Sequence, residues 1–314
     1  MTSAERVDGV VRDGRAPGLH GLVVVEHGAT VVERYGEGED HCLGDPLGHV
    51  VFGPETLHDI RSITKSVVSL LYGIALADKQ VPEPQESLLA QFPEYPDLAE
   101  DPRRTRLTVE HALTMTLGLE WDESAPYTSV ANSEIAMEHA PDRHRFVLER
   151  PIVEEPGQLW RYCGGASALL GRIITNGTGG SLAEFAGRRL FGPLGIEAFE
   201  WTRGADGVEL AAAGLRLTPR ALAAIGGLVL DGGRGIVPRS WIDELSRPRV
   251  RIGDDREYSY QWYVGDGGKW LAAHGNGGQV IHVVPGRELV IAATAGDYDS
   301  DRGSTAAVLE AITA

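Results

Sequence analysis

A serine and a lysine three positions apart, Ser62 and Lys65, are the residues of this chain whose types and spacing best suit covalent chemistry. They begin an apolar run that continues to Ala77 and is typical of a buried helix. Side chains three apart at a helix start lie on one face, so the amine can reach the hydroxyl. A helix N-terminus also favours a developing anion. The pair therefore indicates a nucleophile with its activator.

The surrounding residues help to decide whether Ser62 and Lys65 have a chemical role. An S-x-x-K pattern is expected roughly once by chance in a chain of this composition, and an exposed serine beside a solvated lysine would look the same. The context favours the chemical interpretation. Asp59 can cap the helix start, and the helical pattern is interrupted only at residues 78–80 and Pro82.

Strand patterns occupy both ends of the chain. Residues 22–26 and 30–34 flank His27-Gly28-Ala29 and predict a β-hairpin. Near the C-terminus, consecutive strands joined by short turns must be antiparallel, because a parallel pair needs a long crossover. These segments are residues 258–264, 269–274, 279–284 and 288–295, followed by a helix over 304–312 that would cover the sheet.

The middle of the chain reads differently, with helical patterns such as residues 109–115 and 166–174 between Pro- and Gly-rich breaks. We therefore expect an α/β (α+β) fold, an antiparallel sheet flanked by helices with an inserted helical lobe. The α/β lobe would comprise residues 1–57 and 205–314. The mainly helical lobe would comprise residues 58–204, with the active site at the interface.

Composition excludes several classes of partner. The formal net charge of −16 argues against nucleic acid or an anionic membrane, since both need a basic face. The ten histidines show no metal-binding spacing and the two cysteines no C-x-x-C pair, so we expect neither a metal nor a cofactor. The first eight residues lack the apolar segment of a secretory signal, which predicts a cytoplasmic protein. The sequence does not specify an oligomeric state.

Several motifs, in one order and at fitting spacing, resemble the serine hydrolases of the penicillin-recognising group. The similarity is to the class C β-lactamase-like branch, which includes esterases and 6-aminohexanoate-dimer hydrolases, and it runs from about residue 17 to residue 296. It implies a β-lactamase/transpeptidase-like fold. The motifs that carry it are residues 57–66, 112–119, 160–165, 193–196, 214–220 and 274–279.

The resemblance assigns catalytic roles to Ser62, Lys65 and Tyr162. Ser62 would form the acyl-enzyme, and Lys65 and Tyr162 would share the proton that the serine loses. We expect the ammonium to lower the pKa of the tyrosine, and burial to lower that of the lysine. The family motif Y-x-N becomes Tyr162-Cys163-Gly164 here, which leaves Lys65 one partner short and disfavours β-lactam binding.

The third family motif lies on the strand that edges the site. Two registers are open: His274 stands at the position of the family's lysine, or the triplet Gly275-Asn276-Gly277 does. By the same resemblance, the oxyanion would be met by the backbone N–H of Ser62 and by one from residues 276–278, which are Asn276, Gly277 and Gly278.

Aromatic residues near the motifs are candidates for the substrate pocket, although most such residues pack in the core. They are Trp160, Tyr260, Trp262 and Tyr127, and His274 joins them as a candidate substrate-binding residue. The segment from 120 to 145 lacks periodicity and could form a lid. Cys163 has nothing nearby in sequence to lower its pKa, so we expect a buried packing residue.

These observations predict a serine hydrolase of the carboxylesterase or amidase type that acts on small esters or amides. An acyltransferase or amide-forming enzyme of the same fold is the first alternative, because deacylation by an alcohol or amine would use the same site. A non-catalytic binding protein that has kept the fold is the second. The acyl group and the leaving group of the natural substrate are left open.

Overall fold

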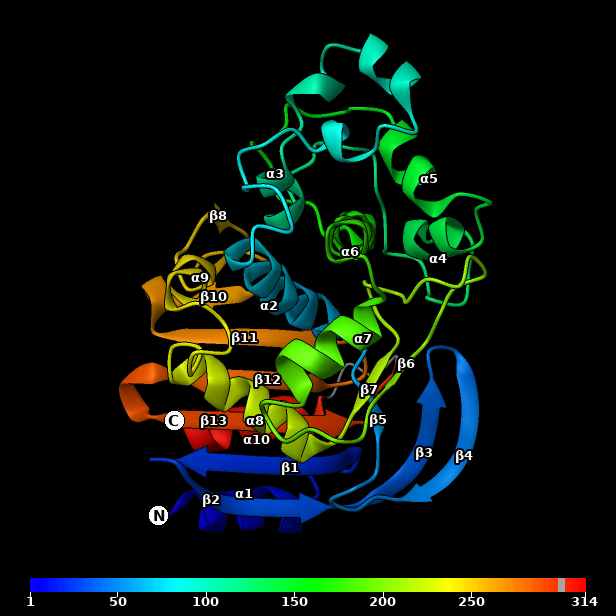
Figure 1. The fold of residues 1–314 in the computed structure, drawn as a ribbon. Helices are drawn as coiled ribbons and strands as arrows, with labels where there is room; N and C mark the ends of the chain where they lie inside the picture. The colour runs from blue at the N-terminus through cyan, green and yellow to red at the C-terminus, as the bar shows by residue number, and fades with distance from the viewer. Residues whose placement is uncertain (299–302) are drawn as a thin grey trace.

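The computed structural model describes residues 1–298 and 303–314. Its centre is a sheet in the order β2-β1-β13-β12-β11-β10-β9-β8, with every neighbouring pair antiparallel (Figure 1). The strands are β1 (Leu19–Glu26), β2 (Ala29–Tyr35), β8 (Val250–Arg251), β9 (Arg256–Tyr258), β10 (Tyr263–Gly265), β11 (Trp270–Gly275), β12 (Gln279–Val284) and β13 (Leu289–Ala295). The antiparallel sheet, and the hairpin around His27-Gly28, are as the sequence predicts.

One predicted strand is wrong. Residues 258–264 form two strands, since β9 ends at Tyr258 and β10 begins at Tyr263, directly opposite it. The chain reverses between them at Gln261, which has a φ of 60°. The buried Gln261 amide donates to the carbonyls of Ala112 and Leu113 at 3.0 and 3.1 Å, and so ties this turn to the helical side of the molecule.

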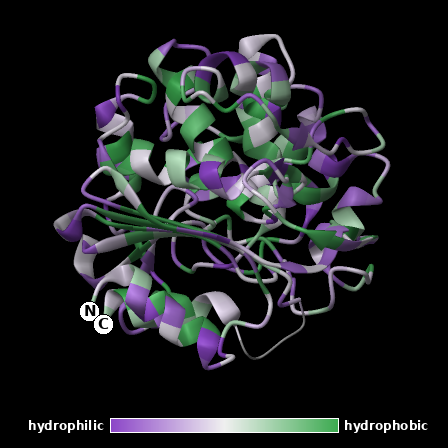
Figure 2. Cartoon of the chain, turned by 90° about the horizontal axis from the view of Figure 1, so that it is seen from below, coloured by the Kyte–Doolittle hydropathy of each residue, from purple (hydrophilic) through white to green (hydrophobic). Residues whose placement is uncertain are grey.

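Helices cover both faces of the sheet. Figure 2 shows the sheet edge-on, with the two terminal helices on one side and the remaining helices on the other. The terminal pair is α1 (Ser3–Arg12) and α10 (Ser304–Thr313), and α10 covers the sheet as predicted. The others are α2 (Ile63–Ala77), α3 (Val109–Leu113), α4 (Ser133–Glu138), α5 (Arg143–Glu149), α6 (Gly164–Thr178), α7 (Leu182–Ala186), α8 (Pro219–Leu230) and α9 (Arg239–Leu245). Among the described helices, none is long and apolar enough to cross a bilayer.

Helix α2 is the central element of the site, and residues Ile63–Ala75 are all buried. Because the helix is buried on every side, its few polar side chains need partners inside the protein. The hydroxyls of Ser66 and Ser69 donate to the carbonyls of Gln261 and Tyr260, both at 2.7 Å. These contacts fix the rotation of α2, and with it the direction in which its first turn points.

Two small sheets lie at the N-terminal end of α2. One is the hairpin β3 (Glu37–Cys42) and β4 (Asp45–Val51), which the sequence patterns did not single out. The other joins β5 (His58–Asp59), β7 (Leu215–Leu217) and β6 (Glu200–Trp201). The two small sheets include or contact the residues that lead into α2. The division into lobes at residues 57 and 204 stays a prediction.

Candidate active site

A strained turn brings the chain into α2. Arg61, directly before Ser62, has a φ of 50°, a conformation that costs a residue with a side chain about 1–3 kcal/mol. The fully buried Asp59 carboxylate stabilises it by accepting the N–H of Arg61 at 2.9 Å and that of Leu43 at 2.6 Å. Asp59 therefore holds the turn before the helix, rather than capping the helix as the sequence suggested.

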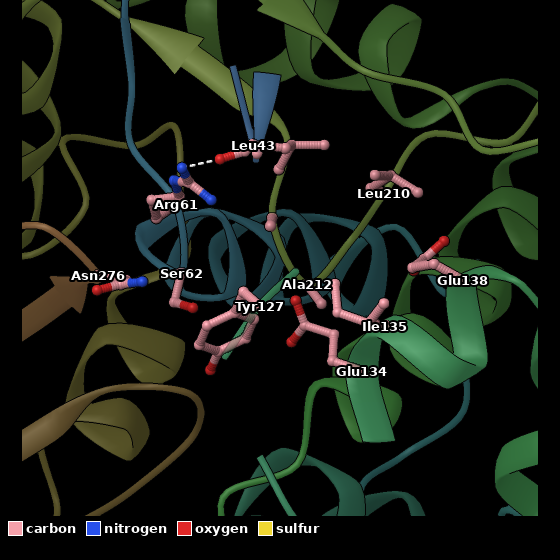
Figure 3. Close-up of a pocket in the computed structure, with 12 residues that line it drawn as sticks. Leu43, Arg61, Ser62, Tyr127, Glu134, Ile135, Glu138, Leu210, Ala212 and Asn276 are labelled. Atoms are coloured by element: carbon pink, nitrogen blue, oxygen red, sulfur yellow. Dashed lines mark hydrogen bonds between the residues drawn. The ribbon is translucent and has the colours of Figure 1, made fainter. Parts of the chain in front are cut away.

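The Arg61 side chain completes this turn. Its Nε lies 3.1 Å from Asp59, its guanidinium donates to the Leu43 carbonyl, and its Cζ lies 4.7 Å from the centre of the Tyr298 ring. The hairpin β3–β4 is thereby tied to the turn at residues 59–61, which we call the nucleophile turn because it directly precedes Ser62, the predicted nucleophile. Figure 3 shows the Arg61–Leu43 bond at the edge of the cavity.

Ser62 and Lys65 are in contact, as their spacing predicts. The Lys65 Nζ donates to Ser62 Oγ at 3.0 Å, to the Ala212 carbonyl at 2.7 Å and to Glu134 Oε2 at 3.3 Å. An ammonium has three N–H donors, so this arrangement uses them all. Lys65 is thus fully partnered, and the expectation that the missing asparagine leaves it one partner short is wrong.

The charges around Lys65 also differ from expectation. Burial alone would lower the pKa of Lys65, but the carboxylates of Glu134 and Glu123 outweigh it and hold that pKa above its ordinary value. Burial raises the pKa of Tyr162 well above its ordinary value, and the nearby Ser62 hydroxyl offsets this only in part. The ground state therefore pairs an ammonium with a neutral phenol.

Tyr162 lies beside the same two residues. The Lys65 Nζ is 5.1 Å from the centre of the Tyr162 ring, and the Ser62 side chain is near enough to the tyrosine hydroxyl to influence its pKa. Ser62, Lys65 and Tyr162, which come from the turn before α2, from α2 itself and from the residues before α6, are thus brought together as the sequence predicts. Cys163 is buried, and burial raises the pKa of its thiol, which keeps it protonated.

The end of β11 forms the opposite edge of the site. A side chain at Gly275 would approach the Ile60 carbonyl to 2.4 Å, so only glycine allows the strand to lie this close to the nucleophile turn. Asn276 follows it and lines the same cavity as Ser62, whereas His274 is outside that lining among the described residues. This geometry favours the register in which Gly275-Asn276-Gly277 faces the nucleophile.

The glycine-rich loop after β11 is fixed through its carbonyls. The buried Gln279 amide donates to the Asn276 carbonyl at 3.2 Å. The Asp297 N–H donates to the Gly277 carbonyl at 3.0 Å, and the Thr305 hydroxyl donates to the Gly278 carbonyl at 2.6 Å. Gly277 and Gly278 have φ values of 85° and 92°, which glycine adopts without strain. Whether one of their N–H groups meets an oxyanion stays a prediction.

A cavity of about 130 Å³ opens at Ser62. In Figure 3, Ser62 and Asn276 lie on one side, and Tyr127 and Glu134 point toward the same space from the other. The lining is mainly apolar, and four of its residues, Tyr127, Glu134, Ile135 and Glu138, come from the segment that the sequence marked as a possible lid. The lining residues are Leu43, Gly44, Arg61, Ser62, Tyr127, Glu134, Ile135, Glu138, Leu210, Ala212, Ala213 and Asn276.

The predicted aromatic candidates fall into two groups. Tyr127 lines the cavity, and its hydroxyl donates to Glu123 at 2.8 Å. Trp262 and Tyr260 are buried in the core, which is the common fate of such residues, and neither lines the cavity among the described residues. Trp160 packs against Tyr162, with ring centres 6.0 Å apart, and so supports the site from behind.

Two carboxylates of the site were missed in the sequence. Glu123 accepts the N–H of Gly164 at 2.6 Å, at the start of α6, and Glu134 contacts Lys65. Burial raises the pKa of Glu134 to about 6, against the opposing effect of Lys65. Both lie in the acidic segment 120–145. The available signal was Gly164, because a glycine has no side chain to contact Lys65 and another residue could take that place.

Comparisons with known proteins agree with this architecture. The sequence model of the family described as Beta-lactamase matches residues 4–313. The lovastatin esterase of Penicillium rubens is 30% identical over 140 residues, so the match spans 43% of this chain and 34% of the esterase.

Solved structures extend the likeness over the whole chain. EstCE1, described as a hydrolase with promiscuous acyltransferase activity, has a TM-score of 0.79 at 16% identity, with 99% of this chain and 98% of that chain covered. A Bacillus anthracis protein described as a 6-aminohexanoate-dimer hydrolase has a TM-score of 0.78 at 20% identity, with 98% and 80% covered. At these identities the likeness establishes the fold, which confirms the fold predicted from the sequence motifs.

Proposed function

Because the chain belongs to the beta-lactamase family, we propose that it is a serine hydrolase that cleaves small esters or amides through an acyl-enzyme on Ser62. The observation that carries the proposal is the contact of Lys65 Nζ with Ser62 Oγ, 3.0 Å apart, at the wall of a cavity. A serine hydroxyl is a weak nucleophile and needs such an activating partner.

The reaction follows from the groups in place. The reactive form of the enzyme is the one in which the pair formed by Lys65 and Tyr162 has released one of its two protons. Ser62 Oγ then attacks the carbonyl carbon, and its proton passes to the vacant site of this pair. The same pair then returns a proton to the leaving alcohol or amine. Backbone N–H groups of Ser62 and of the loop after β11 would bind the oxyanion, and each such donor contributes about 2.7–4 kcal/mol. Water then attacks the acyl-enzyme and releases the acid.

The cavity favours a small acyl group. Its volume of about 130 Å³ is close to that of a cavity that holds benzene, about 150 Å³. The mainly apolar lining suits a short acyl chain or a single ring. A second hollow shares Arg61, Tyr127 and Asn276 with the first and extends to His41 and Tyr298, so it offers room for a leaving group. The lovastatin esterase similarity supports an ester as substrate.

Labelling with a fluorophosphonate tests the nucleophile. We expect the intact mass to rise by one adduct, peptide mapping to place it on Ser62, and Ser62→Ala to abolish both labelling and hydrolysis of short aryl esters. Ser246→Ala, on the turn after α9 and outside the cavity, is the matched control and should be labelled like the wild type. An adduct on another serine, with Ser62 unmodified, would contradict the proposal.

Acyl transfer is the second candidate, favoured by the structural similarity to EstCE1. The same acyl-enzyme would pass its acyl group to an alcohol or amine held in the second hollow. Product analysis with an added short alcohol separates the two functions, because a transferase forms more new ester than free acid even in dilute alcohol.

A further inference from the structure

We propose that Glu134 is a positioning residue that replaces the side chain absent at Gly164 and holds Lys65 against Ser62. The inference rests on the proposed function, since it concerns how the nucleophile of that reaction is activated. It adds a residue from α4 that no motif of the sequence marks.

The Glu134 carboxylate and a side chain at position 164 would overlap in space. A Cβ atom built on Gly164 would lie 2.0 Å from Glu134 Oε2 and 2.7 Å from its Cδ. The carboxylate therefore occupies the volume that a side chain at position 164 would need. The same Oε2 atom lies 3.3 Å from Lys65 Nζ. An asparagine at 164 would thus reach Lys65 from the place where the glutamate now stands.

The ion pair between Lys65 and Glu134 is buried. The side chains of Lys65 and Glu134 are 2% and 7% exposed, so the ion pair is shielded from water. A buried charge that loses its partner is strongly destabilised, whereas one that keeps it is held in a single geometry. Two of the three donors of Lys65 go to Glu134 and to the Ala212 carbonyl, which aims the third at Ser62.

Hydrogen bonds hold the first turn of α4, which carries Glu134, in place. The Glu134 backbone N–H donates to the side chain of Asn132 at 2.9 Å, which caps α4. The fully buried Asn132 also donates to the carbonyls of Glu123 and Ala125, at 3.2 and 2.8 Å. These bonds fix the first turn of α4 and hence the direction of the Glu134 side chain.

A reciprocal exchange tests the proposal. We expect Glu134→Ala to lower kcat for a short aryl ester about 10- to 100-fold, as for the loss of one hydrogen bond to a charged group, with KM within about threefold of the wild type. Gly164→Asn alone should also lower kcat, because it displaces the glutamate from Lys65. The double variant E134A/G164N should recover most of the activity, because an amide then replaces the carboxylate.

The matched control is Glu110→Gln. Glu110 is a half-buried carboxylate between Arg249 and Tyr260, at 2.8 and 2.7 Å, and it lies outside the cavity. We expect this variant to lose stability without losing kcat. Equal kcat in wild type and Glu134→Ala, or a folded double variant no more active than Glu134→Ala, would overturn the inference. An inactive, unlabelled wild type would instead overturn the proposed function.

The pH profile of Glu134→Gln gives a readout that loss of packing would not change. The titratable and charged groups that face Glu134 are Lys65, Glu123, Arg61, Glu138, Tyr127 and Tyr162. Because the Glu134 carboxylate helps raise the pKa of Lys65, its neutralisation should lower that pKa. The rising limb of kcat/KM should therefore move to lower pH. If the double variant does not fold, this measurement decides, and an unmoved limb refutes the role of Glu134.

Discussion

At the scale of single residues, the site is held by the donor geometry of one ammonium. Lys65 donates to a hydroxyl, a carbonyl and a carboxylate, and the resulting charge balance keeps its proton in place. In the proposed reaction, the proton of Ser62 can enter the pair formed by Lys65 and Tyr162 only after the pair has released one of the two protons that it holds in the ground state. The remaining proton then belongs to both residues rather than to one of them.

This coupling predicts a non-additive mutant cycle. We expect Lys65→Ala and Tyr162→Phe each to abolish most acylation, and the double variant to be scarcely less active than either single variant. The measurement is kcat/KM on an activated ester for all four proteins, with folding checked by thermal unfolding. Losses that multiply would mean that the two residues do not share one proton-transfer function.

The sequence was informative for residues that belong to ordered motifs and uninformative for residues that meet only in space. Ser62 and Lys65 are one helical turn apart, so their contact follows from local geometry. Glu134 and Gly164 come together only when α4 packs beside α6, and no periodicity encodes that contact. The pKa direction expected for Lys65 was wrong for the same reason, because the carboxylates that raise it lie in a segment without a regular pattern. The direction expected for Tyr162 was wrong because burial, which raises the pKa of a phenol, outweighs the neighbouring charge.

At the scale of elements, the nucleophile turn is held from both sides. The carboxylate of Asp59 ties Arg61 to the hairpin β3–β4, and β5 pairs with β7 behind it. Helices α2, α3, α6 and α10 and strands β11, β12 and β13 could be predicted because their hydrophobic patterns are regular. The hairpin β3–β4 could not, because residues 37–51 show little alternation and include three glycines and a proline, which are uncommon in strands.

A buried histidine pair beneath this turn predicts acid sensitivity. His58 Nδ1 bonds the Asp59 carbonyl and its Nε2 bonds His20 Nδ1, both at 2.9 Å, so a second proton on His58 would meet the proton of His20. Burial lowers the pKa of each to about 4. In the unfolded chain a histidine has a pKa of about 6.5, so the unfolded state binds more protons between these values.

The contribution of the histidine pair to stability should therefore be constant above about pH 6.5 and be lost as the pH drops toward about 4. Glu134 and Glu138, whose pKa values burial raises to about 6 and about 7, change stability with the opposite sign, so the effect of the pair is read from the difference between wild type and variant. Thermal unfolding between pH 8 and pH 4 measures this slope. His58→Asn should flatten it in part, because His144 and His282, whose pKa values burial also lowers to about 4, contribute as well. The control is His27→Asn, whose side chain is 74% exposed and should leave the slope unchanged. A slope unaffected by His58→Asn would refute this prediction.

At the scale of the whole molecule, the fold is shared with β-lactamases, whereas we expect the cavity to bind their substrates poorly. The place of the family's asparagine amide is taken by the Glu134 carboxylate, which cannot donate to a β-lactam amide, and Asn276-Gly277 replaces the hydroxyl or cation of the edge strand. Each lost charge-assisted hydrogen bond costs about 1.5–3 kcal/mol.

We therefore expect turnover of a chromogenic cephalosporin at least about 100-fold below that of a short aryl ester, measured as kcat/KM on the same preparation. The two missing contacts give the physical reason, since both act on the β-lactam and neither is needed for a simple ester. Comparable efficiency on the two substrates would show that another part of the cavity recognises the β-lactam.

The position of the chain ends determines how the molecule can be tethered. Helices α1 and α10 pack against each other, and in Figure 1 the N- and C-terminal labels lie at the left end of the strands. The strand β11 runs toward the right and delivers Gly275 and Asn276 to the cavity there. A support or carrier attached at either end would thus hold the protein by the side remote from Ser62, and leave the mouth of the cavity open to the solution.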